Sequence, residues 1–274
     1  EPVLVDIGNN VLKFEQGNII TGINIIDDFL LWTDGYYDRD DGSFQGSEPK
    51  KINIQRCKAG SGANIQVHTK LVVDGTNTGI NITEEHITVI KKKPLRPLSV
   101  KIIPAVSTDK DPLFEKIFPR FSYRYRYADG EYSAFAPFTD VVFNSEYPAT
   151  PDTTQNIVLY DENTAYDTKE PYNSGMRNMI ESIELFDFIS PDMPEDVVQI
   201  DLLYKQENSS VVYVIEIIKN TDTDVNGVLM WTVPGFNNAS SYKGKFEVKS
   251  ENIYAAAPEN QLLRPWDNVP KTAK

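Results

Sequence analysis

The stretch Phe121-Ser122-Tyr123-Arg124-Tyr125-Arg126-Tyr127-Ala128-Asp129-Gly130 decides the fold class of this chain. Its aromatic residues recur at every second position, which is the side-chain period of a β-strand. One face of this strand is therefore expected to be an aromatic wall, and the other, with its serine and arginines, is expected to face water. Ala128-Asp129-Gly130 predicts a turn, and residues 132–138 are expected to return as the second strand of a hairpin.

Short segments with a β pattern continue along the rest of the chain. Residues 200–204 and 211–218 flank the polar turn Glu207-Asn208-Ser209-Ser210 and predict a second hairpin, because the later segment is rich in β-branched residues. The other predicted strands are 3–6, 23–26, 29–32, 52–54, 100–103, 180–186, 229–233 and 246–248. No segment has the length and capping residues of a long helix. This pattern predicts an all-β protein, with a fibronectin/immunoglobulin-like sandwich attached to propeller-like β-strands.

Proline and charge patterns divide the chain into three parts. Residues 1–97 are expected to form a propeller-like β region that ends in a stiff basic linker, Lys91-Lys92-Lys93-Pro94-Leu95-Arg96-Pro97. Residues 98–255 form the expected sandwich, with a long polar insertion at about 144–178 that we expect to serve an interface or a function. Residues 256–274 are expected to be an extended connector to a following region, so the chain is interpreted as an internal piece of a longer polypeptide.

The composition of the chain argues against several classes of function. The 274 residues carry a net charge of −13 with a pI near 4.7, which opposes tight binding to nucleic acid or anionic membranes but suits the passage of DNA without adhesion. The single cysteine, Cys57, cannot form an internal disulfide, and His68 and His86 are too few imidazoles for a Cys/His zinc set. No apolar run approaches the roughly 20 residues of a membrane helix.

Two acidic segments are candidate metal sites, and neither has suitable spacing. Asp38-Arg39-Asp40-Asp41-Gly42 has a glycine at the fifth position, where a calcium loop needs a ligand. Glu84-Glu85-His86 is predicted to lie on a surface strand, on which Glu85 points away from its two neighbours. No nucleophile elbow, phosphate-binding loop or dinucleotide fingerprint occurs either. We therefore expect a non-enzymatic protein without a metal or cofactor.

The aromatic stripe of the first predicted strand allows two interpretations. It can be a sugar-binding platform or part of the sandwich core, and the core is favoured because each aromatic ring buries a large area. On the opposite face, Arg124 and Arg126 could pair with acids of a neighbouring subunit. The stripe consists of Phe121, Tyr123, Tyr125 and Tyr127.

Two tryptophan motifs are candidate structural or interface elements. Trp32, Thr33 and Asp34 end a strand that a returning segment at 48–56 follows, a pattern similar to one blade of propellers with Tyr-Trp-Thr-Asp repeats. An ordinary strand end is the alternative interpretation. Near the C-terminus, Trp266 stands between two prolines in a turn-forming context, which predicts a rigid clamp at an interface. The residues of this clamp are Arg264, Trp266, Asp267 and Asn268.

Four segments, in one order along nearly the whole chain, resemble a known family. They are residues 18–34 with 49–54, residues 83–94, residues 121–138 and residues 262–271. With motifs such as Leu263-Arg264-Pro265-Trp266-Asp267-Asn268, they resemble the tail nozzle proteins, also called muzzle or stabilization proteins, of crAss-like podoviruses. The chain departs from the pattern of this family in the insertion at residues 38–47 and in the long acidic loop.

The resemblance implies a structural role in a virion. The parent would be a larger protein in which a propeller-like part is interrupted by sandwich modules. Its copies would form a homo-oligomer, a sixfold ring that closes the phage tail and serves as a conduit for genome and cargo proteins. Other tail or portal-vertex proteins would be its partners, and DNA would pass without specific binding. The alternative is an extracellular carbohydrate-binding or adhesion module of a larger secreted protein.

Overall fold

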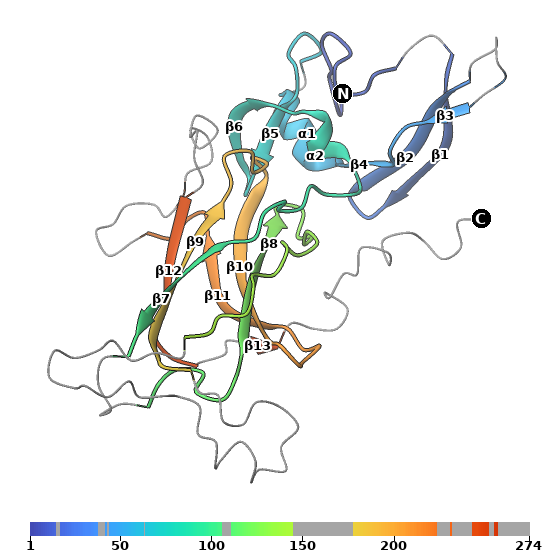
Figure 1. Cartoon of the computed structure of the whole chain (residues 1–274). Coiled ribbons are helices and arrows are strands. Elements are labelled where there is room, and N and C mark those ends of the chain that lie inside the picture. The colour runs from blue at the N-terminus through green and yellow to red at the C-terminus, as the bar shows by residue number, and fades with distance from the viewer. Residues whose placement is uncertain are drawn as a thin grey trace, which may run out of the picture.

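The structure is a computed structural model, in which residues 1–14, 17–37, 42, 44–62, 64–105, 111–144, 178–223, 231, 243–251 and 255–256 are described. Strands predominate in this part of the chain, and its helices are two short segments (Figure 1). The prediction of a mainly β protein is therefore confirmed.

Residues 1–97, the N-terminal region, contain two small sheets and both helices. β1 (Asn18–Ile26) and β2 (Phe29–Tyr37) form a hairpin, and the other side of β2 pairs with β4 (Lys50–Asn53) and β3 (Phe44–Gly46). β5 (Lys70–Val73) and β6 (Thr76–Asn81) form a second hairpin, and the helices are α1 (Ile54–Ser61) and α2 (Glu84–Ile87). A small core holds these elements together and consists of Val11, Trp32, Ile52, Cys57, Ile82 and Ile87.

Two strands predicted in this region differ from the structure. Residues 52–54 divide between β4 and α1, because the side chain of Asn53 accepts a hydrogen bond from the backbone N–H of Arg56 and so caps the helix. Residues 3–6 belong to no strand. They are held through Val5, whose N–H and carbonyl both bind Thr69, instead of through a ladder of strand pairs.

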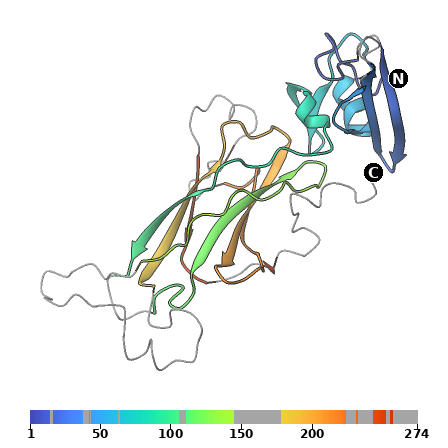
Figure 2. The ribbon, with the colours of Figure 1, turned by 45° about the vertical axis from the view of Figure 1, so that its right-hand side comes forward.

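Residues 98–256, the two-sheet region, contain two antiparallel sheets. One has the order β13 (Ala255–Ala256), β11 (Tyr213–Lys219), β10 (Val197–Gln206) and β8 (Pro119–Tyr127), and the other has the order β12 (Lys243–Val248), β9 (Ile180–Ile189) and β7 (Ser99–Pro104). The two sheets lie next to each other in Figure 2, and both contribute side chains to one hydrophobic cluster. The β10–β11 hairpin and the strands predicted at 100–103, 180–186 and 246–248 are confirmed. Of the strand predicted at 229–233, only Trp231 is described, and of the predicted insertion, residues 145–177 lie outside the described part.

The aromatic stripe of β8 lies in this cluster, which confirms its interpretation as core. Phe121, Tyr123, Tyr125 and Tyr127 are at most 2% exposed. The prediction that the other face of β8 is wet is wrong, because Ser122 and Arg124 are also at most 2% exposed. Arg124 is paired there with Asp201 of β10 at 2.8 Å.

The segment at 131–142 causes this burial. Its N–H groups at residues 133, 136, 139 and 142 donate to the carbonyls of residues 125, 123, 121 and 119 of β8. The returning chain therefore uses three residues for every two residues of β8. This mismatch prevents the regular strand predicted at 132–138, but it lets the segment arch over Ser122 and Arg124, with the Tyr132 ring 4.0 Å from the guanidinium.

Candidate functional site

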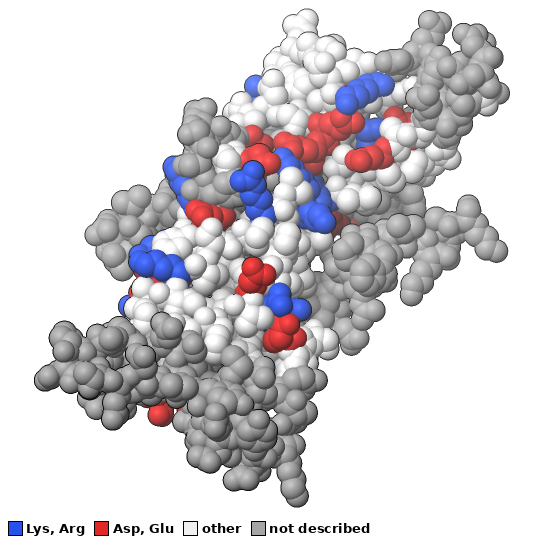
Figure 3. All heavy atoms as spheres, viewed as in Figure 1, with Lys and Arg blue, Asp and Glu red and all other residues white. Residues whose placement is uncertain are grey.

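The N-terminal region and the two-sheet region meet at a cluster of charged side chains, which we term the junction. On the face drawn in Figure 3, acidic and basic side chains lie next to one another at this level of the molecule. One side of the junction is formed by β4, α2 and the segment after α2, and the other by the turn after β8 and the loop between β9 and β10. Its members are Lys51, Glu85, His86, Lys91 and Lys92, opposite Asp129, Glu131, Asp192, Glu195 and Asp196.

Two lysines of the junction are buried in ion pairs. The Nζ of Lys51 lies 2.9 Å from Oδ2 of Asp129, and the Nζ of Lys91 lies 3.2 Å from Oδ2 of Asp196. All four side chains are at most 8% exposed. Because a buried charge without a partner is strongly unfavourable, each pair holds the two regions in one relative position.

Asp129 connects the two pairs. Burial by itself raises the pKa of Asp129, but the charge of Lys91 and the hydrogen bond from Lys51 outweigh it, so the pKa lies below its ordinary value. The carboxylate is therefore ionised at neutral pH. The sequence predicted the turn at Ala128-Asp129-Gly130, and the structure confirms it, but nothing in the local pattern indicated these lysine partners.

The first two residues of the predicted basic linker, Lys91 and Lys92, belong to the junction. Beyond the pairing of Lys91, the Nζ of Lys92 donates to the carbonyl of Asp192 at 2.8 Å, and the carbonyl of Lys92 accepts a hydrogen bond from the Tyr127 hydroxyl. Lys93 is exposed. The segment thus lies in no helix or strand, as expected for a linker, but its first two residues bind the two-sheet region.

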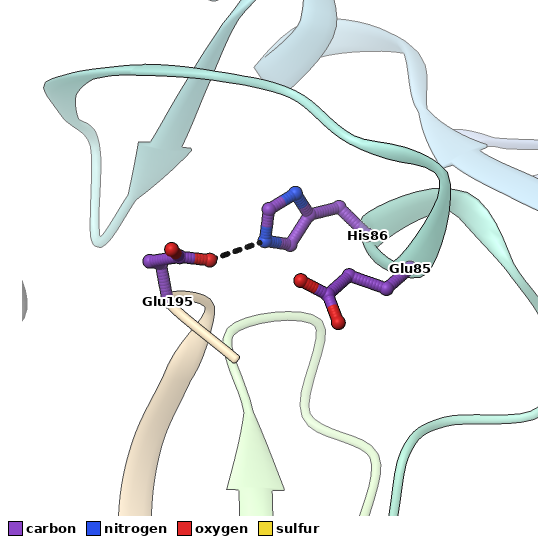
Figure 4. Close-up of side chains that lie close together, drawn as sticks. All are labelled: Glu85, His86 and Glu195. Atoms are coloured by element: carbon purple, nitrogen blue, oxygen red, sulfur yellow. Dashed lines mark hydrogen bonds and ion pairs between the residues drawn. The ribbon is translucent and has the colours of Figure 1, made fainter. Parts of the chain in front are cut away.

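His86 links the two regions through a hydrogen bond. The prediction that residues 84–86 form a surface strand is wrong, because they lie in α2 and the imidazole is buried. The N–H of Thr83 donates to Nδ1 of His86 at 3.0 Å, so Nδ1 carries the lone pair. The proton therefore lies on Nε2, which donates to Oε2 of Glu195 at 3.2 Å (Figure 4). The signal that could have revealed this turn is Thr83, an N-cap residue followed by two acids.

Glu85, His86 and Glu195 also bring possible metal ligands together, with ligand atoms within 4.8 Å of one another. A metal bound at Nε2 would require the proton on Nδ1, but the N–H of Thr83 already points at that atom. Glu85 in addition faces the Nζ of Lys92 at 3.8 Å. We therefore assign these three residues to the structural junction and not to a metal centre.

A cleft at the junction is lined by the cysteine and several cations. Arg56 donates two hydrogen bonds to the carbonyl of Val72, at 3.0 and 2.7 Å. Burial raises the pKa of the Cys57 thiol to about 11, so the thiolate that a nucleophile needs is scarce at neutral pH. The lining residues Lys51 and Lys91 are held in their ion pairs. These groups thus serve packing and pairing.

The motif of Trp32, Thr33 and Asp34 lies on β2 and binds this strand to its neighbours. Trp32 is buried in the small core, and the hydroxyl of Thr33 lies 2.9 Å from that of Thr21 on β1. Asp34 accepts a hydrogen bond from Lys50 at 3.0 Å, and both side chains are at most 2% exposed. The returning strand predicted after the motif is present as β4.

Other predicted sites fall outside the described residues. These are the clamp residues Arg264, Trp266, Asp267 and Asn268, and residues 38–41 of the acidic segment. Both predictions therefore stay predictions.

Comparisons of the chain with protein-family models, with curated proteins and with solved structures gave no match. Among the described residues, no helix combines the length and the apolar character required to cross a membrane.

Proposed function

We propose that the protein is a non-enzymatic structural component of a bacteriophage tail. In this proposal its copies assemble into a nozzle ring, sixfold in the resembled family, that closes the tail and conducts the genome and cargo proteins during ejection. The resemblance of four ordered segments suggests the class, and the net charge of −13 suits a wall along which DNA passes without adhesion.

The observation that carries a structural function is the junction. A conduit wall has to keep its shape under load, and domains within one chain usually move relative to each other unless their interface fixes them. Here buried ion pairs of Lys51 with Asp129 and of Lys91 with Asp196 fix two β regions. Such a locked block suits a building unit better than a hinged binding or catalytic protein.

We also propose a finer fold assignment. The two-sheet region would be a fibronectin/immunoglobulin-like sandwich, which is supported by its four-stranded and three-stranded antiparallel sheets around one core. The sheet of β1 to β4 would belong to a propeller-like unit, supported by Trp32-Thr33-Asp34. Because a propeller needs several blades around one axis, the other blades would come from other parts of a longer polypeptide.

The carbohydrate-binding alternative loses its main support. A sugar platform requires accessible aromatic faces, but Phe121, Tyr123, Tyr125 and Tyr127 are at most 2% exposed.

Virion proteomics and electron microscopy test the proposal. Peptides of the chain should occur in purified particles of the phage that encodes it, at a copy number equal to the ring order. Antibodies against the chain should label the tip of the tail. Absence of the chain from particles, together with binding to polysaccharides on a glycan array, would refute the tail assignment and support the alternative.

A further inference from the structure

β1 is an exposed edge strand in the part of the chain that the structure describes. It pairs there with β2 alone, and it lies at the outer border of the N-terminal region in Figures 1 and 2. Every residue after Asn18 in this strand is exposed. The exposed residues include five isoleucines that are each between 52% and 65% accessible: Ile19, Ile20, Ile23, Ile25 and Ile26.

This edge lacks the usual protection against pairing. Natural proteins protect long edges with lysines, prolines or inward-pointing charges, because an open edge is a template for another strand. The strand Asn18-Ile19-Ile20-Thr21-Gly22-Ile23-Asn24-Ile25-Ile26 contains no charged residue and no proline. In a chain with a net charge of −13, an uncharged strand is also where two copies approach with the least repulsion.

The sequence of β1 is complementary to itself once its bulge is taken into account. In the pairing with β2, Ile20 faces Asp34 and Gly22 faces Thr33, so Thr21 is the extra residue. Without Thr21, an antiparallel pairing centred on Ile23 brings Ile19 opposite Ile26 and Ile20 opposite Ile25 of the second strand. Opposed residues then share a face, so each isoleucine of one strand meets an isoleucine of the other, and Gly22 meets Asn24.

We propose that β1 pairs with β1 of a second copy of this chain, antiparallel and around a twofold axis at Ile23. The contact joins the β1–β2 hairpins of the two copies into one continuous sheet. Ile23 is the most exposed of the five isoleucines, at 65%, and it would face its own equivalent on the axis.

The size of the contact sets its strength. A standard interface buries roughly 800 Å² from each partner, and one strand with five half-exposed isoleucines lies at the small end of the known classes. We therefore expect a dissociation constant on the order of 10 µM. A twofold contact closes with two copies, so it is different from the head-to-tail contact that closes a ring. The proposed β1–β1 contact does not depend on whether the chain is a tail component.

Sedimentation velocity of the purified chain between about 1 and 100 µM, a range that spans this dissociation constant, tests the proposal. The chain should change from monomer to dimer across this range. Ile23→Lys should weaken the dimer at least about tenfold, because it places two like charges opposite each other. The matched control is Ile65→Lys, at a position that is 72% exposed in a loop, and it should leave the dimer unchanged.

A mixing experiment tests the register. Ile20→Lys and Ile25→Glu should each weaken self-association, whereas an equimolar mixture should regain the dimer, because the new lysine of one chain faces the new glutamate of the other. Circular dichroism should show that all variants remain folded, since each changed side chain is more than half exposed. A chain that stays monomeric at about 100 µM, a dimer that survives Ile23→Lys, or a mixture that stays monomeric would overturn the proposal.

Discussion

The guanidinium of Arg124 is a buried charge that is paired with a buried carboxylate. Its guanidinium lies 2.8 Å from Asp201, and both side chains are 2% exposed. Arg124→Ala should lower the free energy of unfolding by about 3 to 5 kcal/mol, because it leaves Asp201 buried without its cation. Tyr125→Ala on the other face should have a similar effect. Urea denaturation measures both. Lys101→Ala removes a lysine that is 64% exposed from its pair with Glu184, and it should change stability by only about 0 to 1 kcal/mol. A value for Arg124→Ala as small as that control would contradict the burial of both faces.

Cys57 makes the stability of the small core depend on pH. Its thiol pKa is raised by burial from 9.0 to about 11, so the folded state holds the proton more tightly than the unfolded state. The resulting stabilisation is fully present below pH 9.0 and is lost as the pH rises toward 11. Between these pH values, urea melts should show a larger fall in the free energy of unfolding for the unchanged chain than for Cys57→Ala. In the folded chain, Cys57 should also react slowly with thiol reagents at about pH 8. Equal losses for both proteins, or rapid labelling, would show that the thiol is accessible.

At the scale of elements, helix α1 depends on a glycine for its contact with β5. A Cβ at Gly60 would lie 2.0 Å from the carbonyl oxygen of Lys70, a backbone atom that cannot move away cheaply. Gly60→Ala should therefore destabilise the chain by about 1 to 3 kcal/mol, although alanine is the better helix former. Gly62→Ala is the matched control, because it meets open space and suffers only from its φ of +58°, worth about 1 kcal/mol. If thermal melts show Gly60→Ala to be the milder change, the close packing of α1 on β5 is wrong.

The elements that the sequence predicted are those with a strong local pattern. The period-two stripe located β8 and its buried aromatic face, and β-branched runs located the β10–β11 hairpin. The short helices α1 and α2 were missed, because helices of about one and two turns carry too little periodicity. Their signals in the sequence are the caps Asn53 and Thr83. The burial of Arg124 was also missed, because its partner Asp201 lies 77 positions away and the strand period does not reveal what covers a face.

For the whole molecule, the junction was the least predictable feature. None of its charged residues stands out in the sequence, and their pairing is visible only in the structure. There Lys91 lies 3.2 Å from Asp196, and His86 lies 3.2 Å from Glu195. In each pair the two residues are more than a hundred positions apart in the sequence. A run of three lysines before two prolines is typical of a solvated linker, and the local pattern contains nothing that separates this case from a docked one.

The junction predicts that the two regions unfold as one unit. Calorimetry of the chain at neutral pH should give a single transition. Unfolding of one region would leave the charges of the other region without their partners, because Lys51 pairs with Asp129 and Lys91 with Asp196. The double variant Lys51→Ala, Lys91→Ala should split this transition, since it leaves Asp129 and Asp196 unpaired at the contact.

Acid should act in the same direction. The pKa of Asp129 is lowered from 3.8 in the folded state, so its contribution is present above that pH and is lost as the pH falls below it. Lys101→Ala changes an exposed lysine of β7 that takes no part in the ion pairs of the junction, and it should keep one transition at neutral pH. If the double variant also melts in one transition at an unchanged temperature, the ion pairs do not couple the regions, and the rigid block that supports the structural function loses its basis.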